Sequence, residues 1–430
     1  MVTIMFNLLA GIFFLCFATL AWINFRYAIL GVIVLLPSYL IRLQFLGLPT
    51  TILELAWLAM VAVWLIKFFR KDWEKIKVFF RNNKILFVSL AVIFLSSLGA
   101  IVVSGYHHAV FMRGAYLALG QWRAYFFEPM VFFMILIGRL VKDKAKEEVD
   151  KDWLVISLVL SSISVAVMGL AQKFFPALYP PSLWNDVLNG RVTSFFTSPN
   201  AVGLFLVPIV PLVVYEIKKF WERKAEGIAL LLFILLFLNL VTIYFSFSQG
   251  GWIALMVGAW VAVISFGYKK TALGLAVVGV IFAILFAPLR EAVLFKDKGS
   301  QNRLRLWQVT EEYLTKSPSN FIFGTGIRRF HADIQKPIFE AKEMERIIYP
   351  HNIFLNFWTE IGFLGMLGIA GILVWGFFKI REARRKNLIW GTTIFVSLLV
   401  LVVHGLVDVP YFKNDLAFLF WTVLGLNIEE

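Results

Sequence analysis

Long apolar blocks, separated by short charged or polar stretches, recur along almost the whole 430-residue chain. Each block has about 17–25 residues, and a helix needs about 20 to cross the roughly 30 Å hydrocarbon core of a bilayer. A membrane β-barrel would instead show segments of about ten residues with apolar side chains at every second position. The pattern therefore predicts an all-α, polytopic integral membrane protein.

The composition agrees with this prediction. The chain is 60% hydrophobic and 16% charged, whereas soluble domains average about 45–50% and about 25%. The net charge of +14 is better explained by basic cytoplasmic loops than by nucleic-acid binding. The single cysteine, Cys16, lies in the first apolar block, which excludes a disulfide framework and a thiolate metal site. The N-terminal stretch lacks the basic region of a cleavable signal peptide, so we expect a retained helix there.

The blocks predict about twelve or thirteen crossings, because the last one is short for a full span. The side that holds the N-terminus depends on that choice. The predicted spans lie near 5–23, 27–42, 51–68, 85–103, 123–139, 153–171, 199–215, 226–245, 250–267, 271–288, 353–378, 388–406 and 415–427. We divide the chain into N-terminal transmembrane helices (1–122), central transmembrane helices with polar loops (123–288), a long loop (289–352) and C-terminal transmembrane helices (353–430).

The connections that carry Lys and Arg all fall on one side of the alternating spans. These basic connections are 67–84, 139–151, 218–224, 269–270 and 379–386. Because short basic loops mark the cytoplasm, the sequence predicts a protein of the cytoplasmic (inner) membrane. The opposite, extracytoplasmic side receives the connections 43–50, 104–122, 172–198, 246–249, 289–352 and 407–414.

The connection 289–352 differs from the others in its length and its balanced charge. Connections this long usually have structure or function of their own. Residues 301–316 have the apolar spacing of an amphipathic helix, which Ser317 and Pro318 end. We therefore predict a small extracytoplasmic cap that contains short helices.

Polar and ionisable side chains near membrane depth are costly and mark candidate functional sites. Most of them lie at the predicted outer ends of spans, which favours one outward-facing site. Arginine predominates, and its planar fork suits bidentate binding of phosphate. The arginine candidates are Arg123, Arg191, Arg303, Arg305, Arg328 and Arg329, and the supporting candidates are Asn200, Glu128, Ser248, Gln249, Asn352, His404 and Asp408.

Motifs for a metal ion or a nucleotide are missing from the predicted outer face. That face has no Asp-x-Asp pair, no His-x-x-x-His and no carboxylate cluster for Mg²⁺ or Zn²⁺. The sequence also has no Walker-type phosphate loop. We expect no metal and no other cofactor.

His351 is the candidate for proton transfer, because it opens a span directly after the long loop. A neutral imidazole there could accept a proton from an attacking hydroxyl, an effect worth about 10²–10⁴ in rate. Its position is equally compatible with an interfacial helix cap. Arg191 and Arg303 are also compatible with ordinary surface cations, and Asn200 with a helix cap alone.

Five segments, in this order, resemble the O-antigen ligase and O-antigen polymerase superfamily of bacterial membrane glycosyltransferases. They are GRVTSFFTSPNAVGLFLVPIVPL (190–212), FSFSQGGWIAL (245–255), QNRLRLW with the downstream FIFGTGIRRF (301–330), HNIFLNFWTEIGFLGMLG (351–368) and HGLVDVPYFKNDLAFLFW (404–421). Each segment alone is weakly specific, but the ordered set spans roughly residues 120–425.

The resemblance implies inverting transfer of a glycan from an undecaprenyl diphosphate carrier to an acceptor hydroxyl, without nucleotide sugar or metal. It implies that Arg191 and Arg303 hold the diphosphate and that His351 serves the acceptor. The family often has Ser-Arg-Gly where this chain has Ser248-Gln249-Gly250. Arg123 and Arg305 are the candidates to replace that missing cation.

Two other classes of function remain open. One is a transporter or flippase of a lipid-linked or anionic substrate, although the sequence lacks the internal repeat that such proteins often show. The other is a structural membrane subunit. If the chain is a transferase, its acceptor could be a lipid, the growing glycan, a protein or a wall polymer.

Overall fold

The computed structural model describes residues 2–45, 48–108, 110–140, 150–178, 190–338 and 347–428. Its regular structure is almost entirely helical, which confirms the all-α class. One small exception lies where a loop near 43–50 was predicted. There, strands β1 (Arg42–Phe45) and β2 (Leu48–Thr51) pair antiparallel. Residues 141–149, 179–189 and 339–346, which belong to three of the predicted connections, lie outside the described part of the chain.

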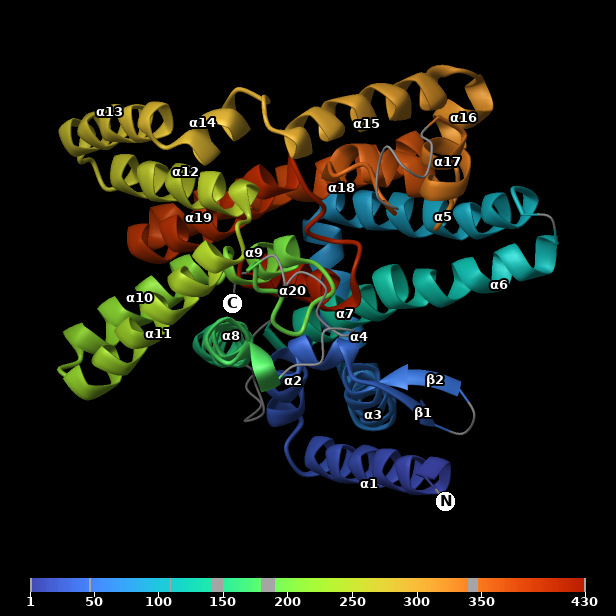
Figure 1. The fold of residues 1–430 in the computed structure, drawn as a ribbon. Helices are drawn as coiled ribbons and strands as arrows, with labels where there is room; N and C mark the ends of the chain where they lie inside the picture. The colour runs from blue at the N-terminus through green and yellow to red at the C-terminus, as the bar shows by residue number, and fades with distance from the viewer. Residues whose placement is uncertain are drawn as a thin grey trace.

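The helices follow the predicted apolar blocks closely (Figure 1). In the first half of the chain they are α1 (Val2–Ile23), α2 (Phe25–Val34), η1 (Leu36–Leu40), α3 (Ile52–Lys67), α4 (Phe69–Asn82), α5 (Lys84–Tyr106), α6 (Phe111–Trp122), η2 (Arg123–Phe127), α7 (Glu128–Leu140), α8 (Lys151–Phe174), η3 (Pro176–Leu178), α9 (Pro199–Leu206) and α10 (Val210–Glu222). In the second half they are α11 (Glu226–Phe245), α12 (Gln249–Ser265), α13 (Lys269–Leu285), α14 (Ala287–Val293), α15 (Lys298–Thr315), α16 (Pro318–Phe323), η5 (His331–Gln335), α17 (Lys336–Ile338), α18 (Ile353–Lys386), α19 (Leu388–Gly405) and α20 (Asn414–Gly425).

Fewer helices than predicted are long and apolar enough to cross a membrane. Among the described residues there are six, or seven if the bent pair α3–α4 forms one span, against the expected twelve or thirteen. The difference arises because several apolar blocks are interrupted or short: the block at 27–42 breaks at Leu35, and α12 has 17 residues. Helix α20 has 12 residues, all of them buried, so it belongs to the interior of the bundle.

Pairs of long helices form the bundle, and the connection that contains α14, α15 and α16 runs along one edge of it. Helix α5 packs against α6 and α18, α12 packs against α19, and α10 packs against α11. In Figure 1, α13, α14 and α15 follow one another along the upper edge, while α1 lies at the lower edge beside the β1–β2 hairpin. The short α20 contacts α7, α9 and α19, which makes it a central support.

A kink in α18 brings the connection against the bundle. Gly362 has φ +81° inside this helix, and a side chain there would come within 2.1 Å of the Ile322 carbonyl oxygen. Gly324 has φ +69°, and a side chain there would come within 2.3 Å of the Thr359 carbonyl oxygen. Only glycine combines this backbone conformation with such close approach. The two glycines therefore fix the connection after α15 to the first part of α18.

Candidate active site

The segment 190–198, which carries the first motif, is fixed by the side chain of Gln172 near the end of α8. The Gln172 Oε1 atom accepts hydrogen bonds from the backbone N–H groups of Thr193 (3.0 Å) and Ser194 (2.7 Å). Its Nε2 atom donates to the Ser194 carbonyl oxygen at 3.0 Å. Arg191 therefore extends from an ordered backbone.

Helix α15 is held beside the segment that leads to His351. The indole of Trp307 donates a hydrogen bond to the Pro350 carbonyl oxygen at 2.9 Å. On the same helix Leu306 and Val309 pack with Phe330 and Ile334 in a small separate core. The amphipathic helix predicted at 301–316 is thus confirmed, with an earlier start, and its first turns face the site.

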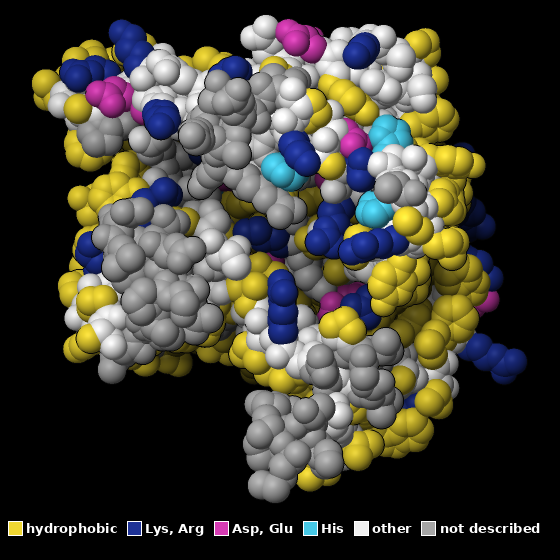
Figure 2. All heavy atoms as spheres, turned by 45° about the vertical axis from the view of Figure 1, so that its right-hand side comes forward, with side chains coloured by type: hydrophobic (Ala, Val, Ile, Leu, Met, Phe, Trp, Pro, Cys, Tyr) yellow, Lys and Arg dark blue, Asp and Glu magenta, His cyan; other side chains and the backbone are white. Residues whose placement is uncertain are grey.

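A polar cavity of about 600 Å³ lies where the starts of α9, α12 and α15 meet the segment before α18. Its side chains are mainly cationic and amide groups, which suit an anionic ligand. The lining residues are Arg191, Ser198, Pro199, Asn200, Phe247, Gln249, Asp297, Gly299, Asn302, Arg303, Leu306, Ile347 and His351. Figure 2 shows one face of the molecule on which Lys, Arg and His side chains gather around a central hollow, bordered by hydrophobic side chains.

A chain of hydrogen bonds joins Arg191 to His351 across the cavity wall. The Arg191 guanidinium donates to Asn200 Oδ1 at 3.1 Å, and the Asn200 amide donates to Asp408 Oδ2 at 2.9 Å. The other oxygen, Asp408 Oδ1, lies 3.2 Å from Nδ1 of His351. The Asp408 side chain is 2% exposed and that of His351 is 19% exposed. The carboxylate is therefore buried behind an imidazole that still reaches the cavity.

The charges around Asp408 keep it ionised. Burial alone would raise the pKa of this carboxyl group, but His351, His404 and Arg303 together hold the pKa below its usual range. The Val409 N–H also donates to Oδ1 at 2.8 Å. Because an ionised carboxylate only accepts hydrogen bonds, Nδ1 of His351 must carry the proton between them. In the neutral imidazole the second ring nitrogen, Nε2, is then left as an acceptor.

Arg303 and Asp297 lie together at the start of α15. A methyl group added to Gly299 would lie 3.0 Å from Asp297 Oδ1 and 3.8 Å from the Arg303 guanidinium. Asp297 caps the helix by accepting from the Ser300 N–H at 3.0 Å. Its Oδ2 atom and the Arg303 Nε atom are both buried and have no hydrogen-bond partner among the described residues. Buried polar atoms without a hydrogen-bond partner are typical of a site at which a ligand supplies that partner.

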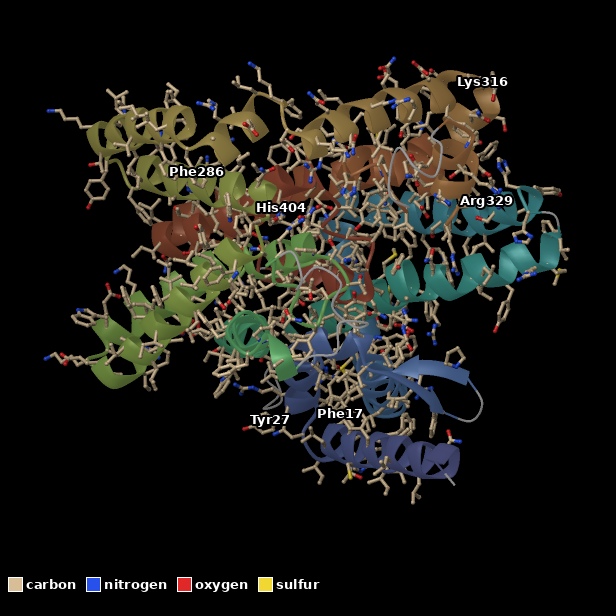
Figure 3. All side chains as sticks on the ribbon, viewed as in Figure 1. Phe17, Tyr27, Phe286, Lys316, Arg329 and His404 are labelled. Atoms are coloured by element: carbon tan, nitrogen blue, oxygen red, sulfur yellow. The ribbon has the colours of Figure 1, made fainter. Side chains whose placement is uncertain are left out.

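A second histidine lies beneath the cavity, at the end of α19. The Nε2 atom of His404 lies 3.3 Å from Ser248 Oγ, and the ring is 2% exposed. Side chains at Gly203 and Gly250 would come within 3.0 and 2.9 Å of its ring, so both glycines are needed for close packing. Figure 3 places His404 near the centre of the molecule, where α19 ends beside the start of α12.

Two lining residues have strained backbone. His351 has φ +53° and Phe247 has φ +51°, a left-handed conformation that costs residues with a Cβ atom about 1–3 kcal/mol. Next to His351, Asn352 caps α18 by accepting from the N–H groups of Phe354 (3.0 Å) and Leu355 (3.1 Å). The helix cap thus belongs to Asn352, which leaves the His351 side chain to the cavity.

The segment 347–351 also lines a smaller cavity of about 160 Å³, through Ile348 and Tyr349. The ring of Tyr349 contacts that of His351, with centroids 5.0 Å apart. Asn356 lines the smaller cavity, is 1% exposed and has no partner for either amide atom among the described residues. The other lining residues are Gln121, Tyr125, Arg328, His331, Ile348, Glu360 and Phe412.

The structure brings together some of the predicted site residues and separates others. Arg191, Asn200, Gln249, Arg303 and His351 line the larger cavity, and Ser248, His404 and Asp408 lie directly behind it. Arg123 and Arg305, proposed to replace the missing cation, are not part of that lining.

Arg123 lies instead in a cluster of its own with two carboxylates. It donates to Glu54 at 2.8 Å and lies 3.3 Å from Glu128. The Asn414 amide donates to the other Glu128 oxygen at 3.1 Å. Arg305 is exposed on the surface of α15. Neither arginine is therefore placed to contact a ligand next to Gln249.

Three polar lining residues, Ser198, Asp297 and Asn302, were not predicted from the sequence. The helix was expected to begin at 301, whereas α15 begins at Lys298 and Asp297 is its N-cap. An Asp directly before an amphipathic run is a helix-start signal. Recognising that signal would have pointed to Asp297.

The fold and the cavity define a polytopic helical membrane protein with a cationic site in which a histidine pairs with a buried aspartate. Residues 231–370 match the model of a protein family described as O-antigen ligase. This match confirms the superfamily that the ordered motifs predicted, that of the glycan-transferring O-antigen ligases and polymerases. The matched range includes Gln249, Arg303 and His351 but not Arg191 or Asp408. No curated protein matches the chain.

Proposed function

We propose that this protein transfers a glycan from an undecaprenyl diphosphate carrier to an acceptor hydroxyl, at the extracytoplasmic face of the cytoplasmic membrane. The observation that carries the proposal is the convergence of Arg191, Arg303 and His351 on one cavity. Arg191 and Arg303 come from distant segments of the chain, and both line the cavity that the His351 side chain also lines.

The cations suit the leaving group of such a transfer. As the bond between sugar and diphosphate breaks, negative charge grows on the diphosphate oxygens, and fixed guanidinium groups stabilise it. Arg191 is oriented by Asn200 and by the Ser246 carbonyl oxygen, which accepts from its Nε at 3.1 Å. The buried Nε of Arg303 is a donor for which a phosphate oxygen is a fitting acceptor.

His351 is the proton acceptor of the proposed reaction. The acceptor oxygen attacks the anomeric carbon, the bond from that carbon to the diphosphate oxygen breaks, and the diphosphate leaves with the electron pair. The proton of the attacking hydroxyl passes to Nε2 of His351, and Asp408 stabilises the imidazolium that forms. A single displacement of this kind inverts the anomeric configuration. The side chains supply the charge stabilisation, so the proposal requires neither a metal ion nor a nucleotide.

The smaller cavity is the proposed place of the acceptor sugar. It adjoins His351 through Tyr349, and its lining of amides, phenols and Arg328 suits hydroxyl groups. Donor and acceptor would then approach His351 from different cavities.

The test uses purified protein in detergent, undecaprenyl-diphosphate-linked glycan and a panel of lipid, glycan and peptide acceptors, with EDTA and without nucleotides. We expect release of undecaprenyl diphosphate together with glycan on one acceptor, and that acceptor separates a ligase from a polymerase. Loss of product on addition of EDTA would overturn the metal-independent mechanism. Intact protein that binds the lipid-linked glycan but forms no product would favour a transporter.

A further inference from the structure

A second site of a different kind lies at the opposite end of α18 from His351. Its cavity of about 510 Å³ lies between the junction of α4 and α5 and the last turns of α18. The part of α18 after its kink, from residue 363 to residue 385, alone spans roughly 33 Å at about 1.5 Å per residue. This site is therefore remote from the cavity that holds His351.

The cavity is strongly basic. Five cationic residues and one acid line it: Arg81, Lys84, Lys379, Arg381, Arg385 and Glu382. Lys379 pairs with Glu382 at 2.8 Å. Within the described ranges, the other four cations form no ion pair with a carboxylate. The lining thus has a large excess of positive charge.

The floor of the cavity is rigid and joins segments far apart in the chain. The side chain of Asn83 accepts a hydrogen bond from the Trp375 indole at 2.9 Å and donates to the Phe79 carbonyl oxygen at 2.8 Å. Both Asn83 and Trp375 are buried. The tendency of cytoplasmic loops to be basic explains the sign of these charges. It does not explain why cations nearly 300 residues apart line one preformed cavity.

Exposed apolar side chains border the same cavity. Phe378 is 55% exposed and Ile85 is 49% exposed, and both are part of the lining. A ligand that contacts these residues and the cations together must carry negative charge and hydrocarbon. A soluble anion would use only the cations.

Helix α4, whose end forms one wall, has the character of an interfacial helix. It is bent by 93° relative to α3, so it cannot continue the direction of that apolar helix through the bilayer. Trp73 and Val78 expose apolar surface on it, while Arg70, Lys77 and Arg81 provide positive charge. Amphipathic basic helices of this kind lie in the headgroup layer.

We infer that this cavity binds the phosphate headgroup of an anionic phospholipid, with the acyl chains against Phe378 and Ile85. Basic pockets between membrane helices bind such headgroups, and each Lys or Arg near the surface contributes measurably to the attraction. This inference is independent of the proposed transfer reaction.

The test measures binding of cardiolipin and phosphatidylglycerol to the purified full-length chain by native mass spectrometry, with phosphatidylcholine as the zwitterionic reference. We expect both anionic lipids to bind and phosphatidylcholine not to compete. The double variant R81A/R385A should weaken binding about 25-fold, at about fivefold per cation. The matched control K269A/K270A removes two exposed cations from the start of α13 and should bind as the wild-type protein does.

Several outcomes would overturn the inference. They are equal binding of phosphatidylcholine, an R81A/R385A variant that keeps wild-type affinity, or equal loss in the K269A/K270A control. Displacement of the lipid by millimolar inorganic phosphate would assign the cavity to a soluble anion instead. The charge-preserving R81K/R385K variant should retain most of the binding. Loss of binding in that variant, together with a lowered melting temperature, would indicate a structural role for the arginines.

Discussion

Two arginines in this molecule are held in opposite ways. Arg139 on α7 donates two hydrogen bonds of 2.8 Å to Asp72, which also accepts from the Trp64 indole at 2.8 Å. Its guanidinium lies over the Phe68 ring, 4.0 Å from the centroid. Arg303 lines a cavity, and its buried Nε has no hydrogen-bond partner among the described residues.

The difference separates a charge that serves the fold from one that is available to a ligand. A buried ion pair whose groups are all hydrogen-bonded fixes the position of helices relative to one another. Arg139 does this for α4, because Asp72 belongs to that helix. A buried donor without a partner lowers stability, and this cost is recovered when an anion binds. The predictions below test this contrast.

The largest expected effect is that of removing the imidazole at the cavity. His351→Ala should lower the transfer rate by about 10²–10⁴, because it removes the proposed proton acceptor. Single-turnover assays with a saturating acceptor measure this. His108→Ala, which removes a histidine from the α5–α6 connection, is the matched control and should retain full activity. Wild-type rates for His351→Ala would exclude the proposed role.

Arg139→Ala tests the structural side of the comparison. Removing one partner of a buried ion pair typically costs about 3–5 kcal/mol, because Asp72 is left buried and unpaired. We expect a clearly lower melting temperature in detergent and an unchanged rate per folded molecule. Adding Asp72→Ala should restore part of the stability. If Arg139→Ala instead lowered turnover at full stability, the distinction between the two arginines would be wrong.

Arg303→Ala should show the reverse behaviour. Losing one fixed donor to the leaving diphosphate should reduce the transfer rate by about 10²–10³, while the melting temperature stays the same or rises. Initial rates and thermal unfolding of the same preparation measure both effects. Arg305→Ala, two residues further along α15, should cost clearly less because its side chain lies outside the cavity lining. Equal losses in both variants would contradict a specific role for Arg303.

The sequence was sufficient for most of the helices because lipid-facing and core-facing apolar blocks are both bounded by charges. The block predicted at 226–245 coincides with α11, and that at 388–406 with α19 to within one residue. The same property concealed the breaks inside blocks. An apolar run does not reveal whether it faces lipid or protein, so the burial of α20 could not be foreseen. The end of α9 at Leu206 lies inside one predicted block.

The residue types of the site could be predicted, but not which of them meet. His351 and Asp408 are 57 residues apart in the chain, and Asn200 and Asp408 are 208 apart. Such pairs depend on how α9, α18 and α19 pack, which no local pattern encodes. Arg123 illustrates the converse. It looked equivalent to Arg191 in the sequence, yet Glu54 and Glu128 hold it elsewhere.

Asp408→Asn tests the partner of the histidine. The variant keeps the shape but loses the charge, so we expect a fall of up to about 10²-fold in rate through misorientation of the ring. An unchanged rate would indicate that Asp408 serves only packing.

Asp408 should also make the stability of the wild-type protein depend on pH. The pKa of Asp408 is lowered in the folded protein. Its contribution to stability is therefore present above about pH 4, the value of an unperturbed Asp, and is lost as the pH falls towards the folded-state pKa. Melting temperatures measured from pH 7 downwards should fall more steeply for the wild-type protein than for Asp408→Asn.

The smallest expected effect concerns Asn356, whose two amide atoms, like the Arg303 Nε, have no hydrogen-bond partner in the described part of the chain. If the smaller cavity holds the acceptor sugar, Asn356→Ala should raise the KM for the acceptor about threefold to tenfold, the value of one hydrogen bond. The KM for the lipid-linked donor should stay constant. Asn302→Ala, which alters the larger cavity, is the reciprocal control and should raise the donor KM instead. A change in donor KM for Asn356→Ala would show that the two cavities do not divide donor from acceptor, even if transfer itself is established.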